Sequence, residues 1–204
     1  MKTIRLTTLA AACGLLASIC TAQAAGTVAV GPWRFTEGNE TSRTMLISTV
    51  KRIMEHNGFT VLPQNRVQST YDGLRPAMKH RRSGVNLPDL ARYAHALQAD
   101  RLVFGAASWH TRSIWVGTGP KTISTATIDL FIYNAKANKI AYQALGVEGR
   151  SDEKESVIKD IAAVVLTPLV TVVSGGPATP REQRAAQIAL GRALRPWTAK
   201  HGNR

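Results

Sequence analysis

The hydrophobic and polar positions of this chain change their spacing several times, and each change marks a predicted element of secondary structure. Residues 27–30 form a short apolar run that Gly31-Pro32 ends, which predicts a buried strand. The apolar residues that follow recur at the spacing of one helical face: Leu46, Val50, Ile53 and Met54. A second short strand is predicted over 59–63, followed by a helical turn or two over 64–71.

The next stretch predicts another helix and a central strand. Asn86 is suited to be the N-cap and Pro88 lies in the first turn. One face of this helix carries four apolar residues: Leu90, Tyr93, Ala94 and Leu97. Residues 101–109 are apolar on both faces, which is typical of a strand in the middle of a sheet.

An alternating pattern over 122–133 predicts a half-buried strand, with a turn at 134–138 and an antiparallel partner over 140–147. Ser151 then suits the N-cap of a last core helix, whose first turn holds Asp152. The predicted order is βαβαβ, then a β-hairpin, then a helix. The fold class is therefore α/β, a mixed sheet with helices packed on it and a basic C-terminal helix.

The predicted core helix continues into a strongly apolar stretch. Residues 161–166 contain no polar side chain, and the apolar character persists past Pro168, which must kink or end the helix. Burial across the sheet is one interpretation, and a surface covered by a partner or another subunit is the alternative. In the second interpretation the interface residues are Ile161, Val165, Leu169 and Val172.

Residues 174–177 break the pattern and predict a boundary between an α/β domain over 26–173 and a linker with a tail helix over 174–204. Pro180 and Glu182 mark the start of that helix. Its basic residues surround an apolar stripe: Arg181, Arg184, Arg192 and Arg195. The helix suits docking on the domain, an anionic membrane surface, lipopolysaccharide, or a groove on a partner.

The first 25 residues carry the features of a signal peptide. Lys2 and Arg5 precede a weakly apolar run over 6–19, and an Ala-x-Ala cleavage site follows. We therefore expect a cleaved signal, a periplasmic or secreted protein, and a mature chain without Cys13 and Cys20. Lipidation is not expected, because a bulky isoleucine precedes Cys20.

Three stretches carry a family resemblance: 28–33, an apolar strand closed by Pro and Trp; 58–61, Gly-Phe-Thr-Val; and 90–105, with Ala99-Asp100 before a strand that ends in Gly. They resemble the amino-terminal domain of TolB and the curli-secretion subunit CsgG, over about residues 27–173. The resemblance implies an α/β fold and a non-enzymatic module that binds other envelope components, often as an oligomer.

The sequence shows no catalytic or metal motif. None of the histidines has metal-ligand spacing, including His95 and His110, and Asp129 has no local second carboxylate. Residues 117–122 have Pro120 where a phosphate-binding loop needs Gly. We therefore expect no enzyme activity, no cofactor and no metal.

The chain carries 26 Lys and Arg against 13 Asp and Glu, a net charge of +13 that favours anionic partners. A basic cluster free of acids is either a solvated loop or an anionic contact: Arg75, Lys79, Arg81 and Arg82. Export argues against nucleic acid. The leading hypothesis is a periplasmic binding or assembly module that acts through protein surfaces, with an envelope protein or another copy of the chain as partner. The alternative is direct binding of anionic lipid, lipopolysaccharide or polysaccharide through the basic clusters.

Overall fold

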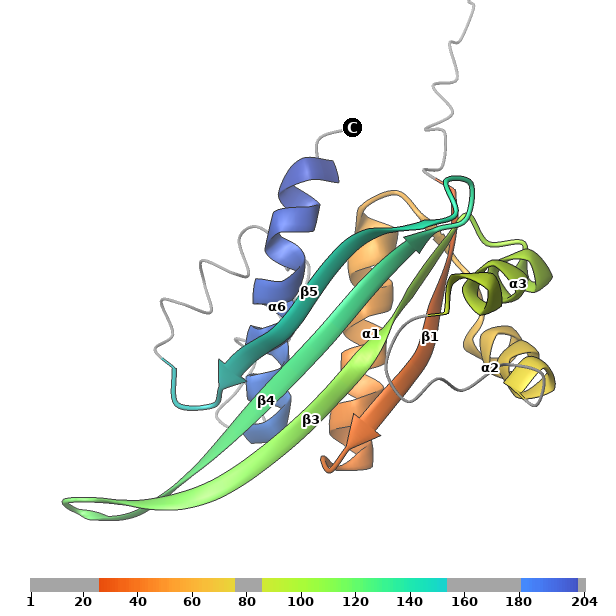
Figure 1. The fold of residues 1–204 in the computed structure, drawn as a ribbon. Helices are drawn as coiled ribbons and strands as arrows, with labels where there is room; N and C mark the ends of the chain where they lie inside the picture. The colour runs from red at the N-terminus through yellow and green to blue at the C-terminus, as the bar shows by residue number, and fades with distance from the viewer. Residues whose placement is uncertain (1–25, 76–85, 154–180, 202–204) are drawn as a thin grey trace, which may run out of the picture.

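The computed structural model describes residues 26–75, 86–153 and 181–201. Within these ranges the chain forms one sheet with helices on both faces (Figure 1). The elements in chain order are β1 (Thr27–Thr36), α1 (Glu40–His56), β2 (Thr60–Val61), α2 (Gln64–Leu74), α3 (Leu87–Leu97), β3 (Arg101–Val116), β4 (Gly119–Asn134), β5 (Lys139–Arg150) and α6 (Arg181–His201). The predicted signal peptide lies outside the described residues.

The sheet has the strand order β2-β1-β3-β4-β5. Strand β1 runs parallel to β2 and β3, whereas β3 with β4 and β4 with β5 pair antiparallel. Two crossovers through helices are thus followed by two hairpins. The predicted α/β class, the mixed sheet and the central position of β3 are confirmed.

Strands β3 and β4 are longer than the sequence pattern predicts. They pair continuously from Arg101 with Asn134 to Val116 with Gly119. The hydrophobic pattern indicated strands only over 101–109 and 122–133, where a core-facing side of the sheet exists. Beyond it, cross-strand pairing rather than burial holds the chain extended, so no apolar period marks the strands there.

Helices α1 and α6 cover one face of the sheet and form the larger core. Val50 and Ile53 of α1, together with Ile188 and Leu194 of α6, are buried there. Gly149 of β5 allows α6 to approach closely, because a Cβ on it would lie 2.3 Å from the Ala185 carbonyl oxygen. The sequence left open where the tail helix docks; the structure places it on β4, β5 and α1.

Helices α2 and α3 cover the opposite face at one end of the sheet (Figure 1). Tyr93 of α3 is buried and donates a 2.9 Å hydrogen bond to the Val67 carbonyl of α2, which ties the two helices together. Burial raises the pKa of Tyr93, so the phenol stays protonated and can donate this bond. The interpretation of 64–71 as a helical turn or two was too short, since α2 extends through Leu74.

The predicted core helix after Ser151 lies outside the described residues except for its first positions. Residues 151–153 form a turn at the end of β5. Ser151 accepts a 3.0 Å hydrogen bond from the Ser124 backbone N–H through its hydroxyl oxygen. The predicted interface residues Ile161, Val165, Leu169 and Val172 also lie outside the described ranges, so their role stays a prediction.

Candidate functional site

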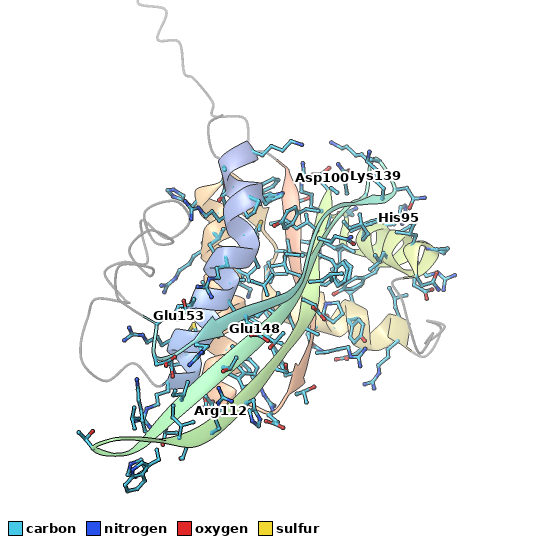
Figure 2. All side chains as sticks on the ribbon, turned by 60° about the vertical axis from the view of Figure 1, so that its left-hand side comes forward. His95, Asp100, Arg112, Lys139, Glu148 and Glu153 are labelled. Atoms are coloured by element: carbon cyan, nitrogen blue, oxygen red, sulfur yellow. The ribbon has the colours of Figure 1, made fainter. Side chains whose placement is uncertain are left out.

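One face of the sheet is only partly covered by the described helices. Helices α2 and α3 reach the stacked pair Phe104 and Phe131, whose ring centroids lie 5.3 Å apart. Beyond this pair, the same face presents exposed side chains from β3 and β5: Ser108, His110, Arg112 and Glu148. We call this surface the bare face. In Figure 2 Arg112 and Glu148 lie on it, away from the end that holds His95 and Asp100.

The bare face continues into a two-stranded arm. Pairing between β1 and β3 ends at Ser108. Pairing between β4 and β5 begins at Thr125, at the same end of the sheet. Residues 110–124, the β3–β4 arm, therefore extend beyond the body of the sheet (Figure 1). Their strands are joined by the ladder and by a 2.9 Å contact between the hydroxyls of Thr111 and Ser124.

The end of the arm is apolar and exposed. Trp115 has 77% of its surface accessible and Val116 has 45%. The sequence drew attention to residues 117–122, which lack the Gly of a phosphate-binding loop, but not to the two residues before them. An apolar pair directly before a Gly-Thr-Gly turn is a local signal that could have identified them.

Two of the four predicted basic contacts on α6 are bonded within the molecule. Arg184 donates a 2.9 Å hydrogen bond to the Glu153 carbonyl, and Arg192 forms an ion pair with the Glu153 carboxylate. Arg192 also donates to the Glu148 carbonyl at 2.8 Å. These bonds fix α6 to the end of β5, so the two guanidinium groups stabilise the fold.

Of the six remaining residues predicted to contact an anionic partner, three are exposed and three lie outside the described residues. Arg181 and Arg195 of α6 are exposed, and so is Arg75 at the end of α2. Lys79, Arg81 and Arg82 lie outside the described residues. The apolar stripe of α6 is part of the core, with Ile188 and Leu194 almost fully buried, so it is not available to a membrane or a partner.

A pocket of about 440 Å³ lies at the opposite end of the sheet, beside α3. Its lining includes His95, Asp100 and Lys136, and the Lys136 ammonium pairs with the Asp100 carboxylate at 3.1 Å. The pKa of Asp100 is lowered, first because its carboxylate accepts the Thr27 backbone N–H. Asp100 is thus held as an anion by the start of β1, which suits a structural role.

Asp129, singled out in the sequence as an acid in mid-strand, also has a structural partner. Its Oδ1 accepts a 2.7 Å hydrogen bond from the Gly146 backbone N–H. Gly146 lies where the register between β4 and β5 shifts, and its φ is +61°. The carboxylate therefore satisfies a backbone donor that the bulge removes from the ladder.

A second pocket, of about 420 Å³, lies between α1 and α6. It is lined by Met45 and Arg52 of α1 and by Gln187 of α6. Gln187 is buried, and its side-chain Nε2 lies 3.7 Å from the Met45 sulfur. The rest of the lining is polar: Glu40, Thr41, Thr44, Ser48 and Thr49.

Across residues 26–75, 86–153 and 181–201, no group of three or more His, Cys, Asp or Glu lies close enough together to hold a metal ion. A search of the same ranges finds no helix long and apolar enough to cross a membrane.

No family model matches the sequence, and no curated protein does. Solved structures match at low identity. A lipoprotein from Neisseria meningitidis is 9% identical, with a TM-score of 0.46, over 74% of this chain and 99% of that one. The LpoB C-terminal domain from Salmonella enterica is 13% identical, with a TM-score of 0.38, over 62% and 82%. A hypothetical protein from Chlamydia trachomatis is 13% identical, with a TM-score of 0.45, over 86% and 98%. The resemblance to TolB and CsgG stays a prediction.

Proposed function

We propose that the protein is a non-enzymatic interaction module of the bacterial cell envelope that acts through a protein surface. One observation carries the proposal: no helix within the described residues covers the bare face, where Ser108, Arg112 and Glu148 are exposed. The predicted signal peptide supports a location in the envelope.

The roles of the acidic side chains support a surface function rather than a reaction. Asp100 accepts the Thr27 N–H, Asp129 accepts the Gly146 N–H, and Glu182 accepts the Asn39 N–H at 3.0 Å. Each of these carboxylates satisfies a backbone donor at the end or at an irregularity of an element. These contacts give each of the three carboxylates a role in stabilising the fold.

The composition of the bare face also suits recognition of a protein. It presents the Arg112 guanidinium and the Ser108 hydroxyl from β3 and the Glu148 carboxylate from β5. Surfaces that mix both charges favour partners with complementary charge, because like charges brought together across an interface are penalised. The expected partner is therefore an envelope protein or a second copy of this chain.

Site-specific photocrosslinking in the native envelope tests the proposal. A photoreactive amino acid is placed at Ser108 on β3 or Glu148 on β5, and the matched control places it at Glu55, an exposed residue of α1 on the other side of the sheet. We expect one or a few discrete protein adducts from the bare-face positions and none from Glu55. Adducts of equal pattern at all three positions, or none at Ser108 and Glu148, would contradict a partner on the bare face.

A further inference from the structure

The β3–β4 arm combines an apolar tip with a basic shaft. Trp115 and Val116 are exposed at the tip, while Arg112 and Lys121 lie farther back on the two strands. Residues 110–124 contain no Asp or Glu. The Asp152 carboxylate, just beyond β5, lies 3.9 Å from the Lys121 ammonium, and the Lys121 side chain remains 52% exposed.

The tip is apolar on both faces of the ribbon. Trp115 pairs with Pro120 across the strands, and side chains of neighbouring residues on a strand point to opposite faces, so Val116 lies on the other side. A groove on a protein contacts one face of a ribbon. A lipid headgroup layer surrounds an inserted tip and contacts both faces, so the tip matches a membrane surface better than a groove.

The backbone of the arm is suited to enter such a layer. The ladder continues to the pair Val116 and Gly119, so only Gly117 and Thr118 lie beyond it. Unpaired backbone groups are what make non-helical chains costly to transfer out of water. The backbone groups that point outward from the two edges of the ribbon can keep partners in the hydrated headgroup layer, so the tip suits that layer rather than the hydrocarbon core.

The spacing of the cations fits the depth of the interface. Arg112 precedes Val116 by four residues, which corresponds to about 13 Å along an extended strand. Interfacial segments bury their apolar side chains about 5–10 Å into the boundary between headgroups and acyl chains, where tryptophan is enriched. When Trp115 is at that boundary, Arg112, three residues back on β3, lies at the level of the lipid phosphates. Lys121 pairs with Ile114, closer to the tip, and reaches the phosphates through its long side chain.

We propose that the tip of the β3–β4 arm inserts into the headgroup layer of an anionic phospholipid membrane, with Trp115 and Val116 at the acyl boundary and Arg112 and Lys121 on phosphates. This site differs from the basic clusters considered in the sequence, because it joins an exposed apolar tip to two cations on the β3–β4 arm. It goes beyond the proposed function, since a membrane contact at the tip is compatible with a protein on the bare face.

Cosedimentation of the purified protein with vesicles tests the site. The probes are vesicles of phosphatidylcholine with phosphatidylglycerol and, for comparison, vesicles of phosphatidylcholine alone. We expect binding to the anionic vesicles and a loss of about tenfold or more in partitioning for Trp115→Ser. The double variant R112Q/K121Q should also lose about tenfold or more on anionic vesicles, and raising the salt should weaken the wild type.

Leu145→Ser is the matched control. Leu145 is 57% exposed on β5, away from the tip, so the change removes a similar kind of exposed apolar surface. We expect its partitioning to equal that of the wild type. Failure of the wild type to bind anionic vesicles would overturn the proposal, and so would equal losses for Trp115→Ser and Leu145→Ser.

Tryptophan fluorescence reports the position of the tip directly. Trp109 and Trp197 are each only 2% exposed and Trp33 is partly buried, so Trp115 is the indole that can change its surroundings on binding. We expect a blue shift of the emission with anionic vesicles. Trp115→Phe should keep most of the partitioning and lose the shift. A shift that persists in Trp115→Phe would overturn insertion of the tip.

Discussion

The carboxylate of Asp100 accepts the backbone N–H of Thr27 at 2.8 Å, and the Asp100 backbone N–H in turn donates to the Thr27 hydroxyl at 3.2 Å. This reciprocal pair joins the first residue of β1 to the residue before β3, although the two are 73 positions apart. It explains why an Ala-Asp dipeptide precedes the central strand. The aspartate fixes the start of one parallel strand against the other.

The Asp100 pair predicts a pH-dependent contribution to stability. Because the folded-state pKa of Asp100 is lowered, its contribution is complete above about pH 4 and is lost as the pH falls through the lowered pKa. We expect Asp100→Asn to lower the free energy of unfolding by about 1 to 2 kcal/mol at pH 7, and by less in acid. Urea unfolding at neutral and acidic pH measures this. A deficit that stays constant with pH would show that the charge is not responsible.

Close contact between α6 and β5 predicts opposite effects for two glycine substitutions. A Cβ at Gly149 would meet the Ala185 carbonyl and the Ala189 amide, both backbone atoms of α6 that cannot move alone. We expect Gly149→Ala to destabilise the protein by about 2 to 3 kcal/mol. Gly73→Ala is the control, since Gly73 lies in α2 with nothing within 4 Å of its added Cβ. It should stabilise by about 0.5 to 1 kcal/mol, and thermal unfolding compares the two.

Glu182, at the start of α6, forms hydrogen bonds to the start of α1, and we expect these bonds to stabilise both ends. Its carboxylate accepts hydrogen bonds from the Asn39 backbone at 3.0 Å and from the Asn39 side chain at 2.6 Å. Glu182→Ala should cost about 1 to 2 kcal/mol and speed amide exchange in the first turn of α1. Glu40→Ala, in that same first turn, removes a charge without these bonds and should cost about 0.5 kcal/mol. Equal exchange rates in both variants would contradict the link.

Two double variants of the α6 arginines have the same net charge, and we expect them to differ in stability. R184Q/R192Q removes the guanidinium groups bonded to Glu153 and Glu148, and we expect a loss of about 1 to 3 kcal/mol. R181Q/R195Q removes two exposed arginines and should change stability by less than about 0.5 kcal/mol. The urea unfolding midpoints of the two double variants measure this difference in stability. Equal midpoints would mean that the bonds of Arg184 and Arg192 add nothing.

Local periodicity was sufficient for α1 and for part of the central strand, but the predicted end of the first strand at Gly31-Pro32 was wrong, because β1 continues past a register shift to Thr36. Leu46, Val50, Ile53 and Met54 recur at helical spacing and are all buried in α1. The run 101–109 is apolar on both faces and forms part of the central strand β3. In both cases the side chains that reveal the element are those that it buries, so the pattern and the packing have the same cause.

The candidate site was predicted less well, because its signals are not periodic. The arm is rich in Ser and Thr and has no continuous buried side, so its strands are held by the ladder between them. Exposure of Trp115 follows from the length of that ladder relative to β1 and β5. These three lengths cannot be read from the residues around Trp115.

The sequence by itself determined the α/β class, the order of the elements and the basic character of the last helix, because each depends on residues a few positions apart. The tertiary structure decided that this helix docks on the sheet, and that Arg192 pairs with Glu153, 39 positions earlier, while Arg195 remains exposed. An amphipathic helix can bury its apolar face on its own domain, on a partner or on a membrane with similar gain. Only the closeness of β5, which Gly149 permits, selects among these surfaces.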